Sequence, residues 1–160
     1  MTHVADAPKG LIRQTNEALI LSAAERVFAR AGFGGATMAT IAEASGLPKA
    51  NLHYYFGSKE VLYRAVLARI LSDWLVPTHG ITADAEPRAA IEQYIRAKMA
   101  LSAQRSDGSK VFANELLHGA PVVHTLLSTE LRQMVLQKAA GTSFVPLGNV
   151  MGPGPVSENS

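Results

Sequence analysis

Apolar residues recur at intervals of three and four along the first half of the chain, which is the spacing of one face of an α-helix. The first stripe comprises Ile20, Ala24, Val27, Phe28 and Ala31. Gly32 follows it, and glycine readily adopts the left-handed conformation in which helices end. The pattern therefore predicts a first helix from about Thr15 to Gly32.

Three more helices are predicted before residue 76 from their end signals. Thr37 is a natural N-cap for a short second helix, which Gly46 ends. Pro48 is tolerated at the start of a third short helix, which Gly57 closes. Ser58 caps a longer fourth helix. The apolar stripe of that helix comprises Val61, Leu62, Ala65, Val66, Ile70 and Trp74.

Helical periodicity resumes in the second half, and no strand pattern accompanies it. The signals predict a helix from Pro87 to about Ser102, a turn at 106–108, a helix ending at Gly119 and a last helix from Pro121 to near Gly141. The expected fold class is therefore all-α. The final stretch, 142–160, holds three Gly, three Pro and no Lys or Arg, so we expect a disordered tail there.

Composition narrows the class of protein only slightly. The 160 residues are 48% apolar, which is enough for a buried core, and the net charge of +2 is a mild basic bias. The absence of cysteine excludes disulfides, thiolate metal sites and cysteine nucleophiles. No apolar run is long enough to span a membrane, and no signal-peptide pattern opens the chain. We therefore expect a cytoplasmic protein without a membrane partner.

The second and third predicted helices, with the tight glycine-containing turn between them, form a helix-turn-helix arrangement. In such a motif the second helix enters the major groove of DNA. On a helical wheel, the core side of this helix carries Leu52, Tyr55 and Phe56. The opposite side carries Ala50 and Tyr54. A small side chain at Ala50 lets the helix approach a groove closely.

The outward part of this helix carries hydrogen-bond donors suited to DNA. The side chains of His53, Tyr54 and Tyr55 carry hydrogen-bond donors on rigid rings, and phosphate oxygens accept hydrogen bonds from such donors. Asn51 can pair with a base edge, and Lys49 with a guanine or a phosphate. A plainer interpretation stays open, in which the rings lie at the edge of the core with their hydroxyl groups in water.

Two more candidates, Thr37 and Lys59, stand at helix starts, where backbone N–H groups also face phosphates. They join the residues of the third helix, including the small Ala50, in one predicted surface. The candidate DNA-binding residues are Thr37, Lys49, Ala50, Asn51, His53, Tyr54, Tyr55 and Lys59.

Residues 20–67 contain a "GF" and "GAT" junction, "IA" followed by "SG", "NLHYYF" and "SKE" followed by Leu62. With these motifs the stretch resembles the DNA-binding domain of TetR-family transcriptional regulators. The resemblance implies a dimeric DNA-binding regulator, usually a repressor that a small-molecule effector releases from its operator. His53 stands where the family often has tyrosine. The implied DNA contacts are Thr37, Lys49, Tyr54, Tyr55 and Lys59.

The resemblance also suggests how the chain is divided. The predicted parts are a flexible arm at 1–14, a helix-turn-helix DNA-binding domain at 15–67, a partial helical effector-binding domain at 68–141 and the disordered tail. Family members build their dimer interface from their last two helices, and no helical pattern follows Gly141. We therefore expect an incomplete or altered C-terminal part and a homodimer that forms poorly.

Other candidate chemistry is sparse. Trp74 lies where the fourth helix passes into the second domain. Its ring therefore either packs in the core or stacks against a flat effector ring. Glu115 and His118 form a single E-x-x-H pair, whereas a di-iron bundle needs two such pairs and two more glutamates. No nucleophile elbow or dinucleotide loop appears. We therefore expect no metal, no cofactor and no enzymatic activity.

Two alternative functions stay open from the sequence. In the first alternative to a ligand-controlled regulator, the chain is a truncated, poorly dimerising fragment that binds DNA weakly. In the second, it is a helical ligand-binding protein that does not bind DNA. The operator, the effector and the sign of regulation do not follow from the residues.

Overall fold

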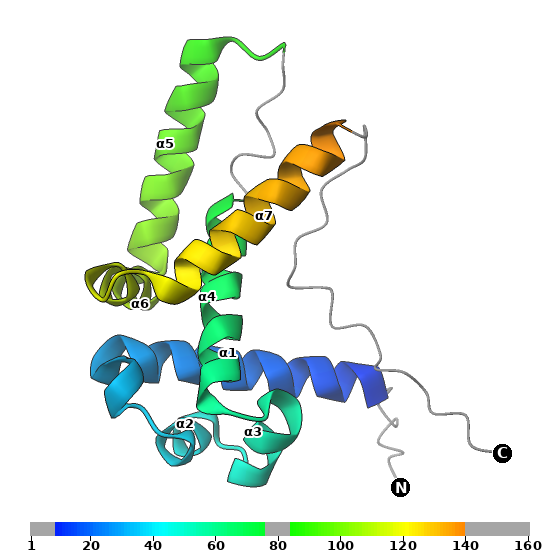
Figure 1. Cartoon of the computed structure of the whole chain (residues 1–160), viewed down its shortest axis with the longest axis vertical. Helices are drawn as coiled ribbons and strands as arrows, with labels where there is room; N and C mark the ends of the chain where they lie inside the picture. Colours follow the sequence, from blue (N-terminus) through cyan, green and yellow to red (C-terminus); the bar gives the residue numbers. More distant parts are fainter. Residues whose placement is uncertain (1–8, 76–83, 140–160) are drawn as a thin grey trace, which may run out of the picture. The chain divides into compact units, whose positions relative to one another are not determined.

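The computed structural model describes residues 9–75 and 84–139, and every regular element within these ranges is a helix (Figure 1). The predicted all-α class is confirmed. The chain divides into two compact units that meet between Val66 and Leu67, inside the fourth helix. We call the first unit the head. The predicted tail and the first eight residues of the predicted arm lie outside the described residues.

The first helix is longer than predicted and is interrupted near its end. Helix α1 spans Lys9–Gly35, so it begins six residues before the predicted start at Thr15. Residues 9–14 are therefore helical rather than part of an arm. Gly32 leaves the helical conformation with φ 68° and ψ 177°. The Ala36 N–H donates to the Gly32 carbonyl at 3.2 Å, so the predicted stop is a kink after which one more turn follows.

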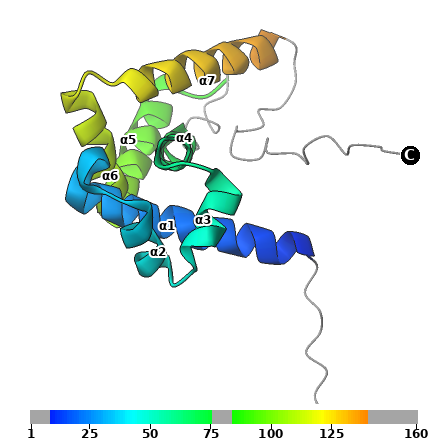
Figure 2. The ribbon, with the colours of Figure 1, turned by 60° about the horizontal axis from the view of Figure 1, so that its bottom comes forward.

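Helices α2 (Met38–Ser45) and α3 (Lys49–Phe56) form the predicted helix-turn-helix and lie together against α1 (Figures 1 and 2). Thr37 caps α2 as predicted. Its hydroxyl accepts the Thr40 N–H, and the Thr40 hydroxyl accepts the Thr37 N–H, each at 3.1 Å. Gly46 ends α2 in the left-handed conformation with φ 72°, which an L side chain would adopt only with strain.

Helix α4 (Lys59–Leu75) begins at the predicted cap, because the Ser58 hydroxyl accepts the Val61 N–H at 3.3 Å. The side chain of Val61 is nevertheless exposed, and so is that of Ala31 in α1. These two members of the predicted stripes lie outside the core. Consecutive helical positions differ by about 100° in direction. Because Leu62 points into the core, its neighbour Val61 points toward solvent.

All four helices contribute to the core of the head. Its largest fully buried side chains include Phe28 and Leu52, and Phe28 packs edge-on against Tyr63 with ring centroids 4.9 Å apart. Because α3 is anchored through its buried side chains, its opposite side faces solvent. The buried apolar residues of the head are Ile20, Ala23, Ala24, Phe28, Ala36, Met38, Ile41, Ala42, Leu52, Phe56, Leu62, Tyr63 and Val66.

The second unit contains the end of α4 and three more helices, α5 (Pro87–Gln104), α6 (Ser106–Leu117) and α7 (Pro121–Ala139). The predicted helices are confirmed, but the predicted turn at 106–108 is wrong, because these residues form the first turn of α6. Asp107 suits that position, since a carboxylate stabilises a helix N-terminus. The break between α5 and α6 is confined to Arg105, with φ −119° and ψ 58°.

Candidate DNA interface

Helix α3 separates its residues into a buried side and an exposed side. Leu52 is fully buried and Phe56 nearly so, whereas Tyr54 is 79% exposed. Lys49, Ala50 and His53 are also exposed, and Asn51 and Tyr55 are half-buried. The helical wheel therefore assigned the two sides correctly, apart from Tyr55, which lies at their border. The outward side presents one cationic residue, two rings with polar tips and a small residue that leaves room for a groove.

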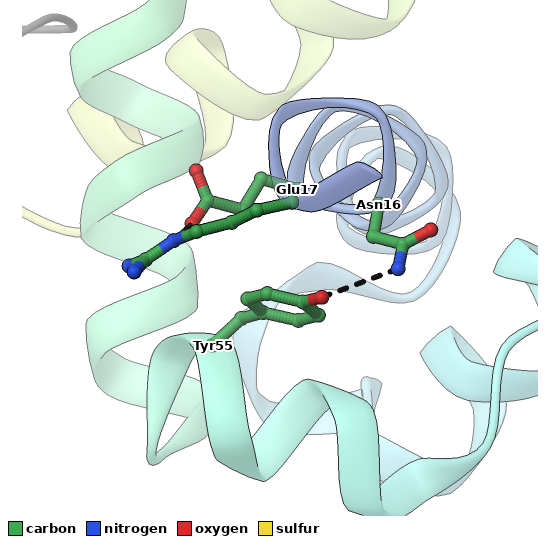
Figure 3. A network of polar contacts seen from close by, with 4 residues as sticks. Asn16, Glu17 and Tyr55 are labelled. Atoms are coloured by element: carbon green, nitrogen blue, oxygen red, sulfur yellow. Dashed lines mark hydrogen bonds and ion pairs between the residues drawn. The ribbon is translucent and has the colours of Figure 1, made fainter. Parts of the chain in front are cut away.

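Tyr55 is held in place by a residue of α1 that the sequence pattern did not single out. The Asn16 side-chain amide donates to the Tyr55 hydroxyl oxygen at 3.2 Å (Figure 3). The hydroxyl keeps its own hydrogen for another acceptor, such as a phosphate oxygen. The Tyr54 ring meets the Tyr55 ring edge-on, with centroids 5.1 Å apart. The two rings therefore have fixed positions relative to α1.

A charged pair lies on α1 next to Asn16. The Arg13 Nε donates to Glu17 Oε1 at 2.8 Å, one helical turn away. This hydrogen bond, followed by the negative charge of Glu17, raises the pKa of the Arg13 guanidinium, and smaller electrostatic contributions come from Tyr54 and Tyr55. Arg13 is thus an exposed cation that is paired with Glu17. Its basic charge is partly neutralised by Glu17.

His53 has a fixed tautomer when it is neutral. Its Nδ1 lies 3.0 Å from the Gly57 carbonyl oxygen. A carbonyl can only accept, so Nδ1 must carry the hydrogen and Nε2 has none in the neutral ring. Neutral His53 can therefore accept a hydrogen bond from a base at Nε2, whereas donation to a phosphate from that atom requires a protonated ring.

The two candidates at helix starts bond their polar groups to neighbouring residues of the head. The Thr37 hydroxyl makes the capping contacts with Thr40. The Lys59 ammonium donates to the carbonyl oxygens of Phe33, at 2.8 Å, and Ala36, at 3.1 Å. The structure thus brings the α3 candidates together on one surface, while it directs the ammonium of Lys59 toward the end of α1.

In the second unit, Trp74 is half-buried and belongs to a cluster of rings around one lysine. Its ring meets that of Phe112 edge-on, with centroids 4.6 Å apart. The Lys98 ammonium lies 5.2 Å from the Trp74 ring centroid and donates to the Tyr94 hydroxyl at 3.2 Å. Lys98, Tyr94 and Phe112 were not predicted, since they come together only when α4, α5 and α6 pack. We call these four residues the Trp74 cluster.

Both residues of the E-x-x-H pair make hydrogen bonds at helix ends. Glu115 is buried, and its Oε1 accepts the Val122 and Val123 N–H groups at 2.7 and 3.2 Å, which caps the start of α7. The His118 Nδ1 donates to the Asn114 carbonyl at 2.7 Å. Within residues 9–75 and 84–139, no three His, Asp or Glu residues are placed to hold a metal ion. None of the helices in these ranges is long and apolar enough to cross a membrane.

The fold and the exposed side of α3 define a helix-turn-helix protein with an attached helical domain. Residues 20–66 match the family described as bacterial regulatory proteins of the tetR family, and residues 67–144 match the C-terminal region of YcdC-like proteins, a second TetR domain. Together the two matches extend over most of the chain, and the chain belongs to the TetR family. The resemblance noted in residues 20–67 is thereby confirmed.

Individual relatives agree with this assignment. The chain is 44% identical over 121 residues to the HTH-type transcriptional regulator RutR of Escherichia coli (strain K12), a regulator of pyrimidine utilisation, covering 76% of this chain and 57% of RutR. It is 30% identical over 97 residues to the regulator BetI of Paraburkholderia phymatum, covering 59% of this chain and 50% of BetI. The chain thus spans about half the length of these relatives.

Among solved structures, a TetR-like transcriptional regulator from Rhodococcus sp. RHA1 has a similar fold. The TM-score is 0.64 at 23% identity, and the match covers 78% of this chain and 68% of that one. At this level of identity the similarity supports the fold and carries no information about ligands.

Proposed function

We propose that the protein is a sequence-specific DNA-binding transcriptional regulator, a repressor that a small-molecule effector releases from its operator. The observation that carries the proposal is the arrangement of α3. Leu52 and Phe56 anchor one side of the helix in the core, and the other side presents small, cationic and polar-tipped residues to solvent. A helix held in this way is suited to a major groove.

Each residue of the exposed side receives a role from its chemistry. Lys49 and Asn51, in the first turn of α3, are the proposed readers of base edges, and Ala50 between them allows close approach. Tyr54 and Tyr55 donate their hydroxyl hydrogens to phosphates on either side of the groove. His53 adds a contact through Nε2, which accepts from a base when the ring is neutral and donates to a phosphate when the ring is protonated. Thr37 places the start of α2, where backbone N–H groups face a phosphate.

Regulation requires two heads and a second ligand. A symmetric dimer would place its heads in successive major grooves about 34–36 Å apart. An effector that binds more tightly to a different head spacing weakens operator binding by that difference in affinity. The expectation that this chain dimerises poorly depends on residues 142–160, which lie outside the described residues, and it stays a prediction for analytical ultracentrifugation.

The Trp74 cluster is the proposed effector site. A flat ring can stack on Trp74 and Phe112, and the Lys98 ammonium offers it a hydrogen-bond donor. Trp74 is the single tryptophan of the chain, so its fluorescence reports on this site directly. In a screen of small ring compounds, we expect effectors to change this fluorescence and to lower the affinity for operator DNA in parallel.

The test of DNA binding is the selection and sequencing of genomic fragments that the purified chain retains. Enrichment of one motif, followed by anisotropy titrations with that motif and with random DNA at two salt concentrations, is the expected result. Retention without any motif would favour the alternative of a fragment that binds DNA weakly. No retention at low salt would favour a helical ligand-binding protein. The proposal also expects a cytoplasmic protein with no enzymatic activity.

A further inference from the structure

His53 lies in the last turn of α3 and is bonded to the residue that ends the helix. Its Nδ1 donates over 3.0 Å to the carbonyl oxygen of Gly57, the C-cap. The two nitrogens of an imidazole ring lie on different edges of the ring, so Nε2 is directed away from this carbonyl. His53 is exposed, and Nε2 has no hydrogen-bond partner among the described residues. One nitrogen thus fixes the orientation of the ring, and the other is available to DNA.

The place of the ring on α3 favours a phosphate over a base as the partner of Nε2. In a helix-turn-helix the first residues of the second helix contact base edges, whereas the phosphates border the groove. The proposed readers Lys49 and Asn51 belong to the first turn of α3. The ring of His53 is bonded to Gly57, which follows the last residue of the helix. His53 is therefore placed for the border of the groove.

The bond to Gly57 also determines what a phosphate meets at Nε2. Because the carbonyl requires the hydrogen on Nδ1, the neutral ring presents a lone pair at Nε2. A phosphate oxygen also presents lone pairs, so the two atoms repel each other. A second proton turns Nε2 into a donor, and the hydrogen bond from an imidazolium to a phosphate is charge-assisted. The contact therefore forms only with the protonated ring.

No acidic side chain of the described head is paired with this ring. Within the described residues, the bond to Gly57 is the one hydrogen bond of His53, and the ring forms no ion pair. The cation on the same exposed side of α3 is Lys49, one turn earlier. The ammonium of Lys59 is bonded to the end of α1. The acidic residues of the described head are Glu17, which pairs with Arg13, the buried Glu25, and Glu43 and Glu60.

We propose that His53 is a proton-dependent phosphate contact, so that the chain takes up a proton at this ring when it binds DNA. The sign follows from linkage, because a complex that holds more protons than its free components is favoured as the pH falls. An ordinary histidine changes its charge at about pH 6.5, so DNA affinity decreases as the pH rises through this region. The inference rests on the proposed function, since it adds a condition to one contact of the same surface.

Matched substitutions in the full chain separate this contact from other titrating groups. His53→Phe keeps a flat ring and removes both nitrogens, and His53→Tyr supplies a hydroxyl donor that keeps its hydrogen up to about pH 10. The control is His118→Gln, because the His118 Nδ1 donates to the Asn114 carbonyl in the same manner on α6. Anisotropy titrations with a random-sequence duplex and with the selected operator are made at about pH 6 and about pH 8, each at two salt concentrations.

For the unmodified chain and for His118→Gln, we expect an affinity for the random duplex about five-fold higher at the lower pH. The salt slope should also be steeper there by up to about 0.9, the value of one phosphate contact. His53→Phe should lose both differences, and His53→Tyr should bind equally well at the two pH values. Calorimetry in two buffers of different ionisation enthalpy should count about half a proton taken up by the unmodified chain at about pH 7, and none by His53→Phe.

Three results would overturn the inference. One is a random-duplex affinity of the unmodified chain that is the same at both pH values. Another is a pH dependence that persists in His53→Phe, because a different group would then titrate. The third is operator binding that strengthens as the pH rises and does so only with His53 present, since Nε2 would then accept from a base.

Circular dichroism at both pH values checks that each variant keeps its helices, so that unfolding is not counted as a lost contact. If the unmodified chain binds no duplex at either pH at low salt, the proposed function fails and this inference fails with it. Duplex binding without a pH effect that depends on His53 removes the inference alone and leaves the proposed function in place.

Discussion

The head and the second unit differ in how they treat their apolar side chains. In the head, the short helix α3 buries Leu52 and Phe56 among residues of the same unit. In the second unit, α5 is more than twice as long and buries none of its side chains. Its Ile91, Ile95 and Met99 recur every four residues and are 57%, 50% and 69% exposed. An amphipathic pattern thus predicts both helices, but described residues cover the apolar side of α3 and leave the apolar side of α5 exposed.

The largest expected effect comes from truncating the anchor of α3. Leu52→Ala should lower the free energy of unfolding by about 2–5 kcal/mol, because it leaves a cavity in the head, and DNA binding should disappear with it. Ile95→Ala, the matched control on α5, should stay within about 0.5 kcal/mol. Circular dichroism during urea unfolding measures both. Equal losses of unfolding free energy in the two variants would show that α3 and α5 bury their apolar sides to the same extent.

In the second unit a buried carboxylate gives the next expected effect. Glu115→Ala removes the acceptor of the Val122 and Val123 N–H groups, and the expected loss of stability is about 1–3 kcal/mol. Glu92, whose carboxylate forms an exposed ion pair with Arg96, serves as the control. Glu92→Ala should cost at most about 0.5 kcal/mol. A Glu115→Ala variant as stable as the parent would mean that solvent replaces the lost acceptor.

The comparison also predicts where DNA is read. Asn51→Ala should weaken operator binding by about 1–3 kcal/mol and leave binding to random DNA unchanged, if its amide pairs with a base edge. Gln93→Ala removes a similar amide from an exposed position on α5 and should change neither affinity. Anisotropy titrations with both duplexes give the answer. Equal losses on operator and random DNA would show that Asn51 is not a reader.

The smallest expected effect separates two neighbouring rings within the head. Tyr55→Phe removes the hydroxyl that accepts from Asn16, so it should cost about 0.5–1.5 kcal/mol of stability. Tyr54→Phe removes a hydroxyl from a side chain that is 79% exposed and should leave stability unchanged. Both variants should bind DNA more weakly, since both hydroxyls are proposed phosphate donors. Thermal unfolding and anisotropy together distinguish the hydroxyl that also supports the fold.

Signals that lie within a few residues of one another were read correctly from the sequence. The cap at Thr37, the left-handed end at Gly46 and the start of α4 after Ser58 depend on local hydrogen bonds and backbone preference. The buried side of α3 followed from helical periodicity alone. The turn assigned to 106–108 was wrong, because glycine after aspartate is also compatible with a first helical turn when α6 packs.

Contacts between distant residues were decided by the tertiary structure. Asn16 reaches Tyr55 across 39 positions, and Lys59 reaches Phe33 across 26. Neither pair leaves a pattern in the chain, because a side chain's polar group can serve any partner that packing brings within about 3 Å. The sequence by itself determined that the protein is helical, where α3 turns its polar side and which family it belongs to. Packing alone decided that the ammonium of Lys59 points to the end of α1, since two helix-end carbonyl groups that require donors meet there.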